Sequence, residues 1–192
     1  MIKVVVVGDI GSGKTHIANL FGYPVFNADD EVAKIYKKNK KCYIKLKKKL
    51  PDYITSFPVK KNKLSEAIIS NKNNIKKIVK IVHPEISKKM NIFINKNKNK
   101  KIIVLDIPLI IENKIYKKKD ILIFVEAKKK QIEKRLRNRV GYNKKIIQQF
   151  KKLQLPVALK KKRSNFIIKN NFKNNSVKKD VKKIIKKILL NA

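Results

Sequence analysis

The stretch "VVVVGDIGSGKTHI", residues 4–17, decides the fold that we expect for this chain. Its four consecutive valines predict a strand buried on both faces, as in the middle of a parallel sheet. The loop after them matches the phosphate-binding pattern G-x-x-x-x-G-K-[ST], the P-loop, with Gly8, Gly13, Lys14 and Thr15. Glycines let backbone N–H groups point at an anion, and the helix that follows presents its positive end. The stretch therefore predicts a nucleotide-phosphate site.

Strand-like and helix-like segments alternate along the rest of the chain. Short apolar runs without polar alternation lie at 3–7, 25–26, 102–105, 121–125 and 166–168. Amphipathic helical patterns lie at 16–21, 64–82, 128–139 and 177–190. This order predicts an α/β chain with a P-loop NTPase-type three-layer fold around a five-stranded parallel sheet.

The long interval between the second and third predicted strands indicates an insertion. It is far longer than one crossover helix requires, and Pro51 and Pro58 divide it into at least two pieces. We therefore expect one domain, whose parts are a core at 1–29, 101–127 and 153–192, a helical insertion at 30–100 and a further helical segment at 128–152.

The charge of the chain is extreme, with a formal net charge of +38. Such a charge is typical of nucleic-acid binding when it is clustered. Here lysines are spread over nearly the whole chain, and Asn and Ile are abundant as well. AT-rich codons specify all three residues, so a compositional bias of the genome explains them together. We expect no specific nucleic-acid partner.

Arginine is rare and clustered. Only four arginines occur against forty-seven lysines, and three of them are Arg135, Arg137 and Arg139. In a helix, Arg135 and Arg139 share a face. The planar guanidinium binds phosphate in a bidentate way that lysine cannot match, so the cluster indicates phosphate contact. The alternative is an exposed, charged helix face.

Several classes of protein are excluded or disfavoured. No apolar run approaches the roughly 18 to 20 residues that span a bilayer, so we expect no membrane segment and a cytoplasmic protein. The single cysteine, Cys42, has no partner for an internal disulfide, and we expect a free thiol. The base-reading tetrapeptide N-K-x-D of GTPases does not occur.

Two carboxylates follow predicted strands. Asp29 comes after the second strand and Asp106 ends the third. The carboxyl ends of parallel strands line the ligand crevice, so both are candidates to act on a hydroxyl near the transferred phosphate. For each, the alternative is a helix cap or a turn. Asp30 and Glu31 are expected to face solvent from a first helical turn.

Short motifs outside the P-loop carry a resemblance to a family. They are "NAD" at 27–29, "VHPEI" at 82–86, "VLDIPLIIEN" at 104–113, Q-x-x-x-R-x-x-x-R at 131–139 followed by Gly141, and "LQLP" at 153–156. With "GDIGSGKT", they make nearly the full chain resemble dephospho-CoA kinase. That family uses ATP to phosphorylate the ribose 3′-hydroxyl of dephospho-coenzyme A, the last step of coenzyme A synthesis.

The resemblance implies roles for individual residues. ATP and Mg²⁺ would be the donor and the metal, with Thr15 as the metal ligand. Residues implied to bind ATP are Gly11, Ser12, Gly13, Lys14, Thr15, His16, Arg135 and Arg139. Asp29 would be the general base, with Lys14 and Arg139 also catalytic. Residues implied to bind the acceptor, dephospho-CoA, are Asp29, His83, Asp106, Pro108 and Leu109. The insertion would hold the acceptor, and residues 128–152 would form a lid over ATP that excludes water; we expect a monomer.

The chain departs from the family pattern at a few positions. Asn27 stands where the family usually has an Asp, which weakens any role there to a neutral contact. Asp9 replaces a common Gly, and we expect its side chain to point outward from the phosphate site. His83 and Pro84 are expected at a junction between helices, because Pro suits a helix start.

Two other functions stay open from the sequence. One is a P-loop kinase of another small molecule, such as a nucleoside monophosphate kinase. The other is a basic, ATP-dependent nucleic-acid-binding protein, which predicts ATP hydrolysis stimulated by RNA or DNA.

Overall fold

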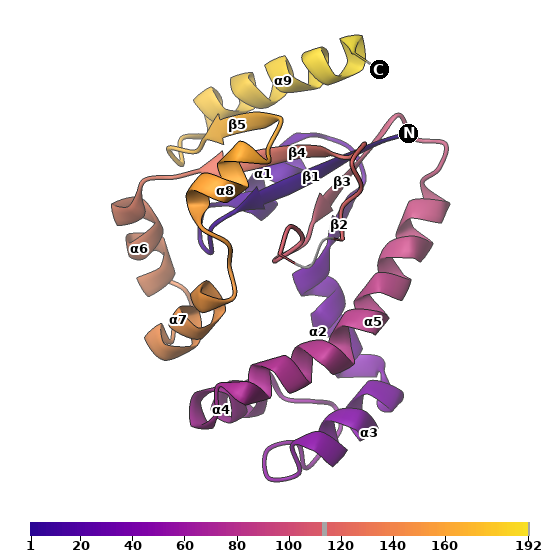
Figure 1. Ribbon diagram of the computed structural model, residues 1–192, viewed down its shortest axis with the longest axis vertical. Coiled ribbons are helices and arrows are strands. Elements are labelled where there is room, and N and C mark those ends of the chain that lie inside the picture. The colour runs from indigo at the N-terminus through magenta and orange to yellow at the C-terminus, as the bar shows by residue number, and fades with distance from the viewer. Residues whose placement is uncertain (113–114, 192) are drawn as a thin grey trace. The chain divides into compact units, whose positions relative to one another are not determined.

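A computed structural model describes residues 1–112 and 115–191 and contains a parallel five-stranded sheet (Figure 1). The strands are β1 (Ile2–Gly8), β2 (Val25–Asn27), β3 (Ile102–Asp106), β4 (Ile121–Glu126) and β5 (Phe166–Lys169). Their order in the sheet is β2-β3-β1-β4-β5. All five strands lie where the apolar runs predict them, and the α/β fold class is confirmed. Asn113, the last residue of the motif at 104–113, lies outside the described residues.

Helices follow or precede each strand. They are α1 (Lys14–Leu20), α2 (Ala28–Lys38), α3 (Lys40–Lys49), α4 (Lys61–Ser70), α5 (Asn73–Lys96), α6 (Lys129–Arg137), α7 (Lys144–Lys152), α8 (Val157–Lys162) and α9 (Asn174–Leu190). No helix in the described part of the chain is long and apolar enough to cross a membrane. The chain divides into two compact units, the first Met1–Asn27, Asn97–Asn143 and Phe150–Ala192, the second Ala28–Lys96 and Lys144–Gln149.

The first unit is built on the buried valines of β1. Val4 and Val6 have no exposed surface and belong to one apolar core with residues of α1 and α9. Alternate side chains of a strand point to opposite faces, so Val5 and Val7 lie on the other face, and both are buried as well. Each buried valine contributes about 1.5 to 3 kcal/mol. The central position of β1 fixes the P-loop at the carboxyl edge of the sheet.

The second unit is helical, as the long interval predicts, but its helices begin and end at other residues. The single helix expected at 64–82 is wrong, because α4 and α5 are separated at Asn71. Asn71 is extended, and its side-chain oxygen accepts a hydrogen bond from the N–H of Asn73 at 2.9 Å. The Asn71 side chain thus competes with helical hydrogen bonds for a nearby backbone N–H, and this contact separates α4 from α5.

Pro84 lies inside α5, so the expected helix junction at His83 and Pro84 is wrong. Proline removes one helical hydrogen bond and normally kinks or ends a helix. Here buried apolar residues on both sides of it, among them Ile78, Val82 and Ile86, anchor one face of a 24-residue helix. Packing therefore outweighs the local preference for a break.

Cys42 is a buried, free thiol on α3, in agreement with the sequence. Asn39 caps this helix by accepting the N–H of Cys42 at 2.9 Å, and its amide nitrogen donates to Glu85 Oε2 at 3.1 Å. Burial, with a smaller contribution from Glu85, raises the pKa of the Cys42 thiol from 9.0 to about 11. Burial likewise raises the pKa of Tyr36. These groups are neutral parts of the packing at physiological pH.

Candidate nucleotide site

The P-loop joins β1 to α1 and is shaped by a close contact at Gly13. Gly13 caps α1 in the left-handed region, with φ 92°. A Cβ built there would lie 2.4 Å from Nδ2 of the buried Asn170, whose amide donates to the main-chain oxygen of Ser12 at 2.8 Å. Both the φ angle and the contact require glycine at this position. Asn170, which follows β5, therefore supports the loop from outside the motif, and the sequence did not predict it.

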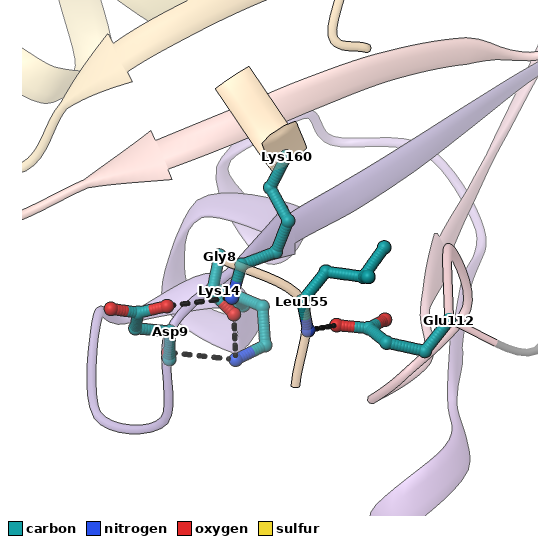
Figure 2. A network of polar contacts seen from close by, with 6 residues as sticks. All are labelled: Gly8, Asp9, Lys14, Glu112, Leu155 and Lys160. Atoms are coloured by element: carbon teal, nitrogen blue, oxygen red, sulfur yellow. Dashed lines mark hydrogen bonds and ion pairs between the residues drawn. The ribbon is translucent and has the colours of Figure 1, made fainter. Parts of the chain in front are cut away.

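Lys14 folds back over its own loop. Its Nζ donates to the main-chain oxygens of Gly8 at 3.2 Å and of Asp9 at 3.0 Å (Figure 2). The ammonium is thus held against the main-chain oxygens of the loop.

Thr15, Asp106 and Asn27 come together at the ends of neighbouring strands. Thr15 donates its hydroxyl hydrogen to Asp106 Oδ2 at 2.6 Å, and Asn27 Nδ2 donates to the same oxygen at 3.3 Å. Asn27 and Asp106 are paired in the register of β2 and β3, which explains the contact. Asn27 makes a neutral contact, as expected for an amide in place of a carboxylate.

Hard oxygen ligands for Mg²⁺ are present at this point. Asp106 is buried, and its carboxylate lies against the Thr15 hydroxyl. No group of three or more His, Cys, Asp or Glu side chains suited to a metal occurs among the described residues. Mg²⁺ in phosphate-transfer sites is usually bound by one or two carboxylates together with substrate phosphates, so the pair fits this ion.

Arg135 lies over an aromatic ring beside the loop. Its guanidinium carbon is 4.4 Å from the centroid of the Phe172 ring. Phe172 has a φ of 61°, unusual for an aromatic residue, and its ring edge would lie 3.4 Å from a Cβ at Gly13. Leu136 of the same helix, α6, packs on Gly11, where an added Cβ would lie 2.9 Å from its Cγ.

Arg139 lies beyond the end of α6. The helix ends at Arg137, and Asn138 caps it. The helix expected to continue to Arg139 is therefore wrong at its carboxyl end, and Arg139 lies two residues beyond α6. Both arginines are exposed.

The loop after β3 borders a small pocket with the P-loop. Pro108, Leu109, Gly8 and Lys14 are among the residues that line it, and its volume is about 10 Å³. That is room for about one water molecule. Leu109 has a φ of 59°, a strained conformation of the kind found at functional sites. Pro108 and Leu109 therefore lie beside the P-loop lysine.

Asp9 makes a contact that the sequence did not predict. It is one-third exposed, but its carboxylate binds the ammonium of Lys160, a buried residue of α8, at 2.6 Å (Figure 2). Lys160 also lines the small pocket. Nothing in the local sequence distinguishes this lysine from forty-six others, so only the packing of α8 could identify it.

The remaining predicted residues lie apart from these contacts or inside the second unit. His16 is exposed on α1, and Ser12 is buried with a hydroxyl that has no hydrogen-bond partner among the described residues. In the second unit, Asp29 is exposed in the first turn of α2. His83 is half-buried on α5, and its Nε2 is buried without a described partner.

Comparison with known proteins identifies the family of the chain. The family model for dephospho-CoA kinase matches residues 2–176. Dephospho-CoA kinases of Wolbachia pipientis wMel and Bartonella quintana are each 32% identical over 166 residues, which cover 84% of this chain and 85% of each relative.

Solved structures share the fold. The dephospho-CoA kinase from Campylobacter jejuni matches with a TM-score of 0.61 and 24% identity, over 97% of this chain and 96% of that one. The shikimate kinase from Acinetobacter baumannii matches with a TM-score of 0.53 and 14% identity, over 100% and 94% of the two chains. With the P-loop, the buried Asp106 and a family match over most of its length, the chain belongs to the dephospho-CoA kinase family, which catalyses the final step of coenzyme A biosynthesis.

Proposed function

We propose that this chain transfers the γ-phosphoryl group of ATP to the ribose 3′-hydroxyl of dephospho-CoA, giving CoA and ADP. The observation that carries the proposal is the convergence of Lys14, Thr15 and Asp106 at the carboxyl edge of the sheet, in a chain of this family. A cation, a hydroxyl and a carboxylate at one P-loop are what phosphoryl transfer requires.

The phosphate end of the site would be formed by the P-loop. Backbone N–H groups of residues 11–15 would bind the phosphates, and Lys14 would exchange its two carbonyl partners for phosphate oxygens. Thr15 and Asp106 would hold Mg²⁺, which supplies charge neutralisation at the β- and γ-phosphates. The 2.6 Å contact between their oxygens supports this assignment.

The base of ATP would bind near Arg135 and Phe172. A guanidinium and an aromatic ring offer two flat surfaces for a purine, and the ring lies beside Gly13 at the start of α1. Arg139, exposed beyond α6, would contact phosphate from the lid. His16, exposed on the first turn of α1, is assigned to the ATP side on the family resemblance alone.

The general base would be Asp29. It is exposed and lies two residues after Asn27, whose amide contacts Asp106. The residues assigned to the acceptor on the family resemblance are Asp106, Pro108 and Leu109 in the first unit, and Asp29, His83 and the rest of the helical insertion in the second.

The reaction is tested by a coupled ADP assay with ATP, Mg²⁺ and dephospho-CoA. We expect turnover with dephospho-CoA and only background ATP hydrolysis with CoA, whose 3′-hydroxyl is already phosphorylated. Equal rates with both compounds would sink the proposal. Nucleoside monophosphates as acceptors in the same assay separate this function from that of a nucleoside monophosphate kinase.

We also propose that the enzyme works in the cytoplasm as a monomer without a specific nucleic-acid partner. Light scattering measures the mass of the particle directly. RNA added to the ATPase assay should leave the rate unchanged, and stimulation that fades steeply with salt would support the nucleic-acid alternative.

A further inference from the structure

A lysine that the mechanism above does not use is buried beside the P-loop. The Lys160 ammonium donates to Asp9 Oδ1 at 2.6 Å. Its side chain is only 3% exposed, whereas that of Asp9 is 34% exposed. Taking an ammonium out of water is costly unless a partner compensates it, so the fold must favour this position.

The position of Lys160 relates it to the transferred phosphate. It lines the same small pocket as Lys14 and Leu109. Both lysines also contact Asp9: Lys14 donates to its main-chain oxygen, and Lys160 donates to its carboxylate (Figure 2). Two ammonium groups thus converge where the P-loop would receive an anion.

The segment that carries Lys160 is fixed at two further points. Leu155, just before α8, donates its N–H to Glu112 Oε1 at 2.9 Å (Figure 2). Lys161, the next residue of α8, forms an ion pair with Glu126 at the end of β4. These contacts hold α8 against the sheet independently of Asp9, so Lys160 can change its partner without release of the helix.

We propose that Lys160 binds the transferred phosphoryl group together with Lys14, and that Asp9 is the positioning residue that holds its ammonium beside the P-loop before the nucleotide enters. The inference rests on the proposed phosphoryl transfer. A triphosphate carries several negative charges and competes well with one carboxylate for the ammonium. Lys160 makes and breaks only hydrogen bonds, and it stabilises the charge that develops on the transferred group.

The competing explanation is that Lys160 only neutralises Asp9. In that case the two residues are dispensable together, and Asp9→Asn restores activity to a Lys160→Met variant. If Lys160 binds phosphate, Asp9→Asn cannot rescue that variant. A double-mutant cycle separates the two explanations.

The cycle uses the full chain in the ADP assay, with ADP affinity measured by calorimetry. We expect Lys160→Met to lower kcat about 100-fold, the loss typical of one charge-stabilising donor, and to change the Kd of ADP less than about threefold. Asp9→Asn alone should lower kcat less than about fivefold, because Asn still accepts a hydrogen bond. The double variant should be as slow as Lys160→Met. Lys162→Met, a change of an exposed lysine of the same helix, is the matched control and should stay within about threefold of the unaltered chain.

Three results would overturn the inference: rescue of Lys160→Met by Asp9→Asn, a rate of Lys160→Met equal to that of the control, or an ADP affinity that falls as much as kcat. Thermal melting is measured on every variant first. If Lys160→Met does not fold, the pair Asp9→Asn with Lys160→Gln keeps a neutral hydrogen bond at the site, and the same 100-fold loss is expected of it. No turnover by the unaltered chain would contradict the proposed function instead.

Discussion

The two units of the molecule use their polar residues differently. In the first unit, side chains far apart in the sequence meet at strand ends: Thr15 binds Asp106, and Asp9 binds Lys160. In the second unit, buried polar groups support helix packing, as Asn74 does by donating to the main-chain oxygen of Ala67 at 2.9 Å. The long-range polar contacts around the P-loop thus lie within the first unit, and Asp29, which we propose as the general base, is one of the exposed carboxylates of the second unit.

The strongest test of this division removes the cation of the P-loop. Lys14→Ala should lower kcat about 1,000-fold, because no other group of the loop replaces its ammonium at the β- and γ-phosphates. The ADP assay measures it, with the exposed Lys178→Ala on α9 as the control. A loss of kcat below tenfold would show that phosphoryl transfer does not depend on the Lys14 ammonium.

The next test addresses Asp29, an exposed carboxylate of the second unit. Asp29→Asn should lower kcat about 100-fold and change ATP affinity little, because a general base acts on the hydroxyl and not on the donor. Asp30→Asn, its neighbour in the first turn of α2, is the matched control. Equal rates in both variants would transfer the role of base to another residue.

A smaller effect is expected at the lid. Arg139→Lys keeps the charge but loses the planar fork, and the loss of one charged hydrogen bond should lower kcat/KM about tenfold. Arg137→Lys, on the last turn of α6, is the control. Full activity of Arg139→Lys would mean that Arg139 is an exposed charged residue without a role in the reaction.

The smallest effect concerns stability and leaves activity unchanged. The Cys42 pKa is raised to about 11, so the folded state keeps a proton that the unfolded state loses near pH 9. The stabilising contribution is therefore complete below pH 9 and is lost as the pH rises toward 11. Urea unfolding at several pH values gives the free energy of unfolding of the unaltered chain and of Cys42→Ala. The difference between the two chains isolates the contribution of the thiol, because all other groups titrate in both chains. If the free energy of unfolding changes equally with pH in the two chains, the protonation of Cys42 does not contribute to stability.

Local patterns predicted the strands and the P-loop well, but not the ends of the helices. The helix expected at 64–82 left out the hydrogen bond that the Asn71 side chain accepts from the backbone N–H of Asn73. The junction expected at Pro84 overrated a local preference that the packing of α5 outweighs. Arg139 was expected on a helix that ends two residues earlier. Each error lies where one side chain or its tertiary contacts decide the path of the backbone.

The sequence by itself determined the parallel sheet, the glycine loop and the carboxylates at strand ends, because apolar runs and short motifs act over a few neighbouring residues. Only the tertiary structure decided which of many lysines lies beside the loop, that Phe172 lies under Arg135, and that Asn170 supports Gly13. Asp9 and Lys160 are 151 positions apart. No local pattern relates such residues, since their contact depends on how α8 packs against β1.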